Sequence, residues 1–222
     1  MDATKTIAAL FDFDGVIMDT EPQYTIFWNE QGQKYLHKEN FGPGIKGQTL
    51  AQIYDKYFSG DLVPVREQIT RELNKFEKDM VYEYLPGVQG FLADLRHHGV
   101  KIALVTSSNE EKMENVYHAH PEFKTQFDRI LTGEMFEHSK PAPDCFLLGM
   151  KIFGTTPENS FVFEDSFHGL QAGRYSGAIV IGLATTNSCE TIIDKADVIM
   201  DDFMGMTYEK LSLIHISEPT RH

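Results

Sequence analysis

Short runs of apolar and β-branched residues recur along the chain, and helical patterns lie between most of them. The runs cover residues 7–11, 100–105, 129–131, 161–163, 178–182 and 197–200. Continuous apolar runs of this length are typical of strands in a parallel sheet that is covered on both faces. Helical spacing, as at Phe91, Leu92 and Leu95, separates consecutive strands. The pattern therefore predicts an α/β fold in which βαβ units form a mainly parallel sheet.

The stretch from residue 22 to about residue 84 breaks this alternation. Its apolar residues recur at steps of three and four, as at Ile69, Leu73 and Phe76, and it has no convincing strand. We predict an all-helical insert over residues 21–84, within an α/β core that takes residues 1–20 and 85–211. An insert after the first strand is well placed to cover a site at the carboxyl end of the sheet. The alternative is that it only adds core area.

The C-terminal segment of the sequence differs in its hydrophobic pattern. Residues 212–222 continue no helical or strand pattern of the preceding sequence. We interpret them as a non-native or disordered tail and leave them out of the fold prediction.

Composition and charge exclude several classes of protein. The chain has 222 residues, enough for one domain with an insert. Its 20 Lys and Arg against 33 Asp and Glu give a formal net charge of −13, which opposes binding to nucleic acid or to an anionic membrane. No apolar run could span a bilayer, and the N-terminus does not resemble a signal peptide. Since Cys145 and Cys189 form no paired motif, we expect a cytoplasmic protein, and we expect it to be a monomer.

Carboxylates directly follow two of the predicted strands. The first strand leads into Asp12 and Asp14, and a later strand leads into Glu164 and Asp165. An acidic pair at the end of a buried strand is costly unless a cation or strong donors neutralise it. Each pair alone could be a solvated turn, but two pairs at strand ends make an oxygen-rich pocket suited to a hard cation such as Mg²⁺.

Two further segments carry groups that can bind an anion. The strand at residues 100–105 leads into the hydroxyl-rich stretch 106–109, and the N-terminus of the following helix offers free N–H groups. One of Ser108 and Asn109 is also expected to cap that helix. Lys140 lies in a loop whose backbone is restricted by neighbouring prolines, which favours a fixed position for its ammonium group.

In this order, the four segments resemble the motifs of the haloacid dehalogenase-like superfamily, and the resemblance covers about residues 6–210. It implies a Rossmann-like three-layer core with a small helical cap, as in β-phosphoglucomutase-like phosphatases, and a bond before Pro141 that is often cis. The segments that match the first to the fourth motif are Asp12-Phe13-Asp14-Gly15 with Asp19-Thr20, then Thr106, then Lys140-Pro141-Ala142-Pro143-Asp144, and finally Glu164-Asp165-Ser166.

The resemblance also implies a role for each motif residue. Asp12 would attack phosphorus and become an aspartyl phosphate. Asp14 would protonate the leaving oxygen and then take a proton from the attacking water, and its presence argues against the metal-free dehalogenases. Mg²⁺ would be held by Asp12, the backbone carbonyl of Asp14 and Asp165, with Glu164 nearby. The residues expected to bind the phosphate group are Thr106, Ser107 and Lys140.

Two positions distinguish a phosphatase from a sugar phosphate mutase. Mutases of this group carry a histidine and a cap-loop arginine where this chain has Tyr24 and Leu50. Without that second cationic anchor a bisphosphate intermediate would be difficult to hold, so we favour hydrolysis of small phosphomonoesters, such as sugar phosphates. A β-phosphoglucomutase-type mutase, a pyrophosphatase and a non-catalytic regulator that binds phosphate or metal stay open as alternatives. Candidates for further substrate contacts are Lys46, Gln48 and Asn109, although the first two could equally lie in a solvated loop.

Overall fold

A six-stranded parallel sheet forms the centre of the molecule in the computed structural model, which describes residues 5–217. The strand order is β3-β2-β1-β4-β5-β6, and every neighbouring pair is parallel. The order reverses between β1 and β4, and in open α/β sheets such a switch point opens a crevice at the carboxyl ends of the strands. The strands confirm the sequence prediction and are β1 (Ala8–Phe11), β2 (Lys101–Val105), β3 (Arg129–Leu131), β4 (Ser160–Glu164), β5 (Ile179–Leu183) and β6 (Val198–Met200).

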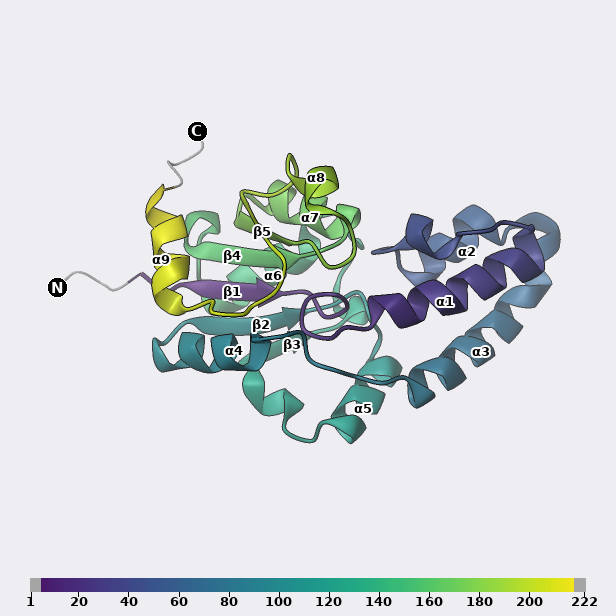
Figure 1. The fold of residues 1–222 in the computed structure, drawn as a ribbon, viewed down its shortest axis with the longest axis horizontal. Helices are drawn as coiled ribbons and strands as arrows, with labels where there is room; N and C mark the ends of the chain where they lie inside the picture. Colours follow the sequence, from purple (N-terminus) through teal and green to yellow (C-terminus); the bar gives the residue numbers. More distant parts are fainter. Residues whose placement is uncertain (1–4, 218–222) are drawn as a thin grey trace.

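Helices cover both faces of this sheet, so the expected three-layer α/β architecture is confirmed (Figure 1). Alternate residues of β1 point to opposite faces: Ala9 and Phe11 pack in one apolar cluster, Ala8 and Leu10 in the other. Within the described chain, no helix combines the length and the apolar character needed to cross a membrane. One face is covered by α4 (Val88–His97), α5 (Glu110–Ala119) and α9 (Tyr208–Ser217), the other by α6 (Asp144–Phe153) and α7 (Phe167–Ser176), while the short helix α8 (Cys189–Ile192) lies near β5 and β6.

The segment between β1 and α4 is helical and lies beyond the carboxyl end of β1, as Figure 1 shows. Its helices are α1 (Glu21–Gln31), α2 (Leu50–Tyr57) and α3 (Arg66–Asp79), joined by short 3₁₀ and π-helical turns. They share an apolar cluster of their own, which includes Trp28 and Phe58. The division into two domains at residues 20 and 84 stays a prediction, and we call the three helices and their turns the helical insert.

The two connections to the helical insert run side by side. The backbone N–H of Asp19 donates to the carbonyl of Glu83 at 2.8 Å, and Met18 forms an antiparallel bridge with Tyr84. The chain therefore leaves β1 and returns to the core at almost the same place, which holds the insert over one end of the sheet.

Residues 208–217 form helix α9, so the expectation of disorder from residue 212 onward is wrong for residues 212–217, while a non-native origin of this segment stays a prediction. The helix is anchored at its start, because the backbone N–H of Tyr208 donates to the Asp94 carboxylate at 2.7 Å. Leu211 is buried, and Tyr208 and Ile214 pack against the same cluster, but an apolar face of only three such residues is too short to recognise as a pattern. The rest of the predicted tail, residues 218–222, lies outside the described residues.

Candidate active site

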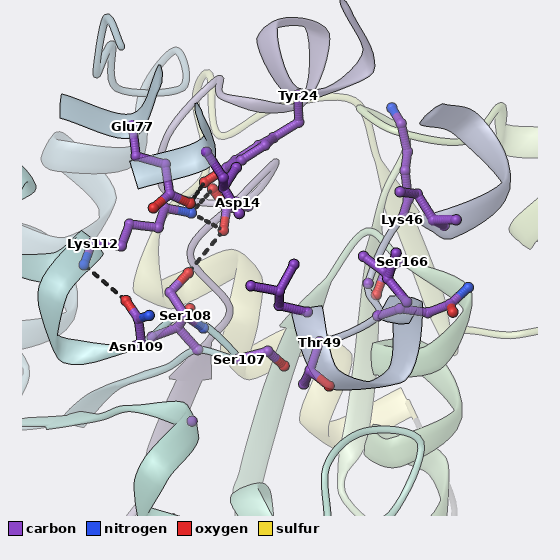
Figure 2. A pocket seen from close by; sticks show the side chains of 18 of the residues that line it. Asp14, Tyr24, Lys46, Thr49, Glu77, Ser107, Ser108, Asn109, Lys112 and Ser166 are labelled. Atoms are coloured by element: carbon purple, nitrogen blue, oxygen red, sulfur yellow. Dashed lines mark hydrogen bonds and ion pairs between the residues drawn. The ribbon is translucent and has the colours of Figure 1, made fainter. Parts of the chain in front are cut away.

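A cavity of about 450 Å³ lies between the strand ends of the core and the helical insert. Figure 2 shows its lining: Tyr24, Glu77 and Lys112 gather around Asp14, and Lys46 and Ser166 lie on the other side. The structure brings residues from all four sequence motifs to this one cavity. The predicted site residues that line it are Asp12, Asp14, Lys46, Gln48, Thr106, Ser107, Asn109, Lys140 and Asp165.

Asp12 continues β1 into the cavity. Its backbone N–H donates to the carbonyl of Phe163 in β4 at 3.0 Å, so the two strand ends that carry the acidic pairs are tied together. The chain then turns sharply at Gly15, whose φ is 73°. A Cβ atom at Gly15 would collide with the carboxylate of Asp165, so only glycine allows the two loops to approach this closely.

We call the side of the cavity formed by Asp12, Lys140 and Asp165 its core end. The ammonium group of Lys140 is the central cation there. It donates to Asp12 Oδ1 at 2.9 Å, to Glu164 Oε1 at 2.5 Å and to the carbonyl of Val105 at 3.3 Å. Burial opposes the charge on Lys140, but Asp12 and Glu164 outweigh it and raise the pKa of the lysine. The Lys140–Pro141 bond is cis, as the resemblance implies. One buried cation is thus shared by two buried carboxylates.

Glu164 is fully buried and has donors on both of its carboxylate oxygens. Lys140 donates to Oε1, while Oε2 accepts from the backbone N–H groups of Asp165 and Ser166 at 3.0 and 3.2 Å. The hydroxyl of Ser166 also donates to Oε2, at 3.1 Å. Glu164 therefore fixes both Lys140 and the loop that carries Asp165.

The carboxylates at this end fit a divalent cation. Oxygen atoms of Asp12, Glu164 and Asp165 lie within 4.8 Å of one another. Burial raises the pKa of Asp12 to about 7, with Glu164 adding to the effect and Lys140 opposing it. Burial, together with Glu21, Glu164 and Asp12, also raises the pKa of Asp165 well above its usual value. A hard cation bound by oxygen ligands would relieve this repulsion, and Mg²⁺ has that preference.

The carboxylate of Asp14 is held by three side chains. Thr20 Oγ1 donates to Oδ1 at 2.5 Å, and Ser108 Oγ donates to Oδ2 at 3.2 Å. Lys112 Nζ lies 2.6 Å from Oδ1 and 2.5 Å from Oδ2. Sequence reasoning missed Lys112, which belongs to none of the four motifs and is only 3% exposed. Because most lysines are exposed, a single lysine on a helix gives no signal of such a position.

Lys112 also connects the core with the helical insert. Its Nζ lies 4.6 Å from the ring centroid of Tyr24 and 5.0 Å from that of Phe13, a cation–π arrangement. The Tyr24 hydroxyl donates to Glu77 Oε1 in α3 at 2.6 Å. Burial raises the pKa of Glu77, while Lys112 opposes this shift. Tyr24, which stands where mutases carry a histidine, is thus part of a packed network.

The stretch after β2 places its residues as follows. Thr106 is buried, and its Oγ1 accepts from the backbone N–H of Ser108 at 3.0 Å. Asn109 is the residue that caps α5, with Oδ1 accepting from the N–H of Lys112 at 2.9 Å, whereas Ser108 bonds to Asp14. Ser107 lines the cavity beside them. The phosphate-binding roles of these residues stay predictions.

The loop of the insert that precedes α2 reaches the core. Lys46 Nζ lies 3.3 Å from Glu21 Oε2, and Gln48 donates within its own loop to the carbonyl of Gly44 at 3.3 Å. Gln52 donates to the carbonyl of Lys140 at 3.1 Å, which ties α2 to the loop of the central lysine. Lys46 and Gln48 therefore line the cavity, and their contact with a substrate stays a prediction.

Comparisons with known proteins find related sequences and a shared fold. Fructose-1-phosphate phosphatase YqaB of Escherichia coli is 29% identical over 173 residues, which cover 76% of this chain and 91% of that protein. A bifunctional riboflavin kinase/FMN phosphatase of Arabidopsis thaliana is 25% identical over 92% of this chain, but the match spans only 53% of that longer protein. The structure of a β-phosphoglucomutase from Clostridium difficile has a TM-score of 0.78 at 21% identity, covers 95% of this chain and 97% of its own, and shares the fold.

The family model for haloacid dehalogenase-like hydrolases matches residues 9–183, a span that holds all four motifs and the whole helical insert. This span is more than half of the chain. The chain belongs to the haloacid dehalogenase-like hydrolase family.

Proposed function

We propose that this enzyme is a Mg²⁺-dependent phosphatase that hydrolyses small phosphomonoesters, sugar phosphates among them, through an aspartyl phosphate on Asp12. The observation that carries the proposal is the arrangement at the core end of the cavity. There Asp12 lies 2.9 Å from Lys140 and shares an oxygen cluster with Asp165, and both aspartates line a cavity that can hold a small metabolite. The phosphatase names of the relatives support the same reaction class.

The residues divide the proposed chemistry between them. Asp12 supplies the attacking oxygen, and the Asp12–phosphorus bond forms as the bond from phosphorus to the leaving oxygen breaks. Asp14 gives a proton to that leaving oxygen and then takes one from the water that hydrolyses the aspartyl phosphate. Lys140 holds Asp12 in place, and Lys140 and Thr106 bind the oxygens of the transferred group.

Asp12 and Asp165, with the backbone carbonyl of Asp14, would hold the metal ion. When bound, Mg²⁺ would neutralise charge on the phosphoryl oxygens and on the nucleophile. Since Glu164 already accepts hydrogen bonds at both oxygens, we propose that it acts on the metal site through Lys140 and Asp165.

The other side of the cavity, which we call its insert end, is lined by residues of the helical insert such as Tyr24, Leu50 and Glu77. This side favours hydrolysis over mutase activity. The Tyr24 hydroxyl is engaged by Glu77, and Leu50 supplies an apolar side chain where a second anion would need a cation. The likeness to a β-phosphoglucomutase at 21% identity concerns the fold alone. We further propose that the enzyme is a cytoplasmic monomer, which sedimentation of the purified chain would test for the oligomeric state.

Phosphate release from p-nitrophenyl phosphate tests the proposal directly. We expect release with Mg²⁺, no release with EDTA, and recovery when Mg²⁺ is added back. Asp165→Asn is expected to lose the response to Mg²⁺, whereas the matched control Asp194→Asn, on the surface, is expected to keep it. Glucose 1-phosphate and pyrophosphate are assayed alongside. Efficient conversion of glucose 1-phosphate to glucose 6-phosphate, or exclusive hydrolysis of pyrophosphate, would overturn the proposal.

A further inference from the structure

The cavity carries more acid than base, and this imbalance bears on the part of the substrate that leaves. Resting on the proposed function, we infer that the leaving group is an uncharged hydroxyl-bearing group, and that Glu21 enforces this choice by neutralising Lys46. The enzyme would then accept phosphomonoesters of sugars or polyols and reject substrates with a second phosphate or a carboxylate. Neither the motifs nor the family assignment names Glu21.

Each lysine that lines the cavity already has a carboxylate partner. Lys140 lies 2.9 Å from Asp12 Oδ1, and Lys112 lies 2.5 Å from Asp14 Oδ2. Lys46 Nζ lies 3.3 Å from Glu21 Oε2. Among the described lining residues there is no other lysine or arginine and no histidine. A second anionic group on the substrate would therefore meet no unpaired cation.

The remaining lining charges are acidic. Three lysines face seven carboxylates around the cavity, a formal balance of −4 that a bound Mg²⁺ would reduce only to −2. Charges in a partly buried cavity interact several times more strongly than in bulk water. The phosphate group would be compensated by Lys140 and the metal ion, whereas a second anionic group on the substrate would face the uncompensated carboxylates. The lining carboxylates are Asp12, Asp14, Glu21, Glu77, Glu111, Glu134 and Asp165.

Glu21 and Lys46 are both shielded from solvent, so their pairing is stronger than that of a surface ion pair. The side chain of Lys46 is 17% exposed and that of Glu21 is 12% exposed. Glu21 is the first residue of α1, and Lys46 stands in the loop before α2, so the pair lies across two parts of the insert. Without Glu21, Lys46 would present its charge to the substrate.

Glu21 also offers an acceptor to a hydroxyl group. Its Oε2 atom is buried and accepts no hydrogen bond within the described part of the chain, although the ammonium group of Lys46 is near. A carboxylate oxygen can accept from a second donor beside the ammonium group of Lys46, so a substrate hydroxyl can donate to this atom. Neutral polar side chains of Gln48, Thr70 and Asn74 line the same cavity and can pair with further hydroxyls.

Matched ligand pairs test this inference by binding instead of turnover. Asp12→Asn protein with Mg²⁺ is titrated by calorimetry with fructose 1-phosphate against fructose 1,6-bisphosphate, and with glycerol 3-phosphate against 3-phosphoglycerate. Each pair differs in one added anionic group or in one hydroxymethyl group replaced by a carboxylate. We expect the less charged member to bind at least tenfold more tightly in both pairs.

A second substitution assigns the effect to Glu21. Adding Glu21→Gln to Asp12→Asn is expected to reduce the ratio of the two dissociation constants in each pair at least fivefold, because Lys46 becomes free to bind the extra anion. The control Glu111→Gln removes an equal charge from the lining, but Glu111 bonds to Asn74 and not to a lysine, so the ratio is expected to stay within twofold. Melting temperatures check that each variant is folded.

Three results would overturn the inference: equal binding of both members of a pair, no binding of the less charged member of either pair, or equal effects of Glu21→Gln and Glu111→Gln. The proposed function fails separately, through an absence of Mg²⁺-dependent phosphate release by the unmodified enzyme. The two failures are distinguishable because the binding ratio requires no turnover.

Discussion

The two ends of the cavity are built in different ways. At the core end, residues from strand ends far apart in sequence meet around Lys140, which contacts both Asp12 and Glu164. At the insert end, three residues from three different helices meet through side-chain contacts: Tyr24 of α1, Glu77 of α3 and Lys112 of α5. The backbone of the parallel sheet fixes the first arrangement, whereas the second depends on how helices of the insert dock on the core.

The two ends also differ in charge. The core end shares one lysine between two carboxylates, and a divalent cation would complete the balance. The insert end has paired lysines and additional acids, so it has no spare positive charge. With the proposed function, this difference would place phosphoryl chemistry at the core end and the choice of leaving group at the insert end.

The largest loss of stability and activity is expected from Lys140→Met, which removes the cation at the core end of the cavity. The change leaves Asp12 and Glu164 buried without their cation, and removal of one partner of a buried pair costs about 3–5 kcal/mol. Hydrolysis of p-nitrophenyl phosphate is expected to fall by about 10³-fold or more, the scale on which loss of a group that stabilises transition-state charge is felt. Urea denaturation and initial rates measure both effects.

Lys151→Met is the matched control, because Lys151 is an exposed lysine on α6 outside the cavity. It is expected to leave the unfolding free energy within about 0.5 kcal/mol, as surface changes usually do. A Lys140→Met protein as stable as the unmodified chain would show that the core end does not depend on this one cation.

A smaller loss is expected from Lys112→Met, which tests the connection between the two ends. Asp14 would lose its two contacts with the lysine but keep those with Thr20 and Ser108. We expect kcat to fall about 10²-fold with KM within threefold, since misplacing an acid–base residue affects the chemical step.

Lys112→Arg keeps the charge and is expected to recover part of kcat, while Lys124→Met, at an exposed surface position, is expected to change neither constant. If Lys112→Met raised KM and left kcat unchanged, Lys112 would bind substrate instead of positioning Asp14.

The smallest effect is expected from Glu77→Gln and concerns stability as a function of pH. Burial raises the pKa of Glu77, so the folded state holds its proton at pH values where the unfolded chain has released it. The unmodified protein therefore loses stability as pH rises from the ordinary glutamate pKa through the raised value. Glu77→Gln has no carboxylate at this position, so it does not lose stability in this way as the pH rises. Its amide oxygen can still accept the hydrogen bond from the Tyr24 hydroxyl.

At pH 8 the melting temperature of Glu77→Gln is expected to exceed that of the unmodified chain by about 2–4 °C, equivalent to ~1 kcal/mol. The difference should shrink near pH 4.5. Calorimetry at both pH values measures it, and Glu67→Gln, on the exposed side of the same helix, serves as control. An equal difference at both pH values would contradict titration of Glu77 as its cause.

The sequence predicted most of the fold and the core end of the cavity, for a physical reason. Strands buried on both faces are continuous apolar runs, and carboxylates that directly follow such runs stand out. Because parallel strands share one carboxyl edge, Asp12 and Asp165 could be expected to meet although their separation in sequence is large. The cis bond at Lys140–Pro141 followed from the resemblance.

The insert end could not be predicted in the same way. Lys112 and Glu77 look like ordinary solvated residues of amphipathic helices, and their burial arises from tertiary packing that no local pattern records. The pairing of Lys46 with Glu21 joins a loop to a helix start, so it depends on how the insert folds. Helix α9 was missed because its apolar face is short and its start is fixed by a distant residue, Asp94.

The most direct test of Asp12 as the nucleophile is mass spectrometry of the intact enzyme, quenched in acid during turnover of p-nitrophenyl phosphate with Mg²⁺. The unmodified chain is expected to gain the mass of one phosphoryl group, and peptide mapping of the same acid-quenched sample is expected to place it on the peptide that contains Asp12. Asp12→Asn, folded by its melting curve, is expected to gain none and to release no phosphate. Phosphate release by folded Asp12→Asn at the rate of the unmodified enzyme would contradict the assignment of Asp12 as the nucleophile.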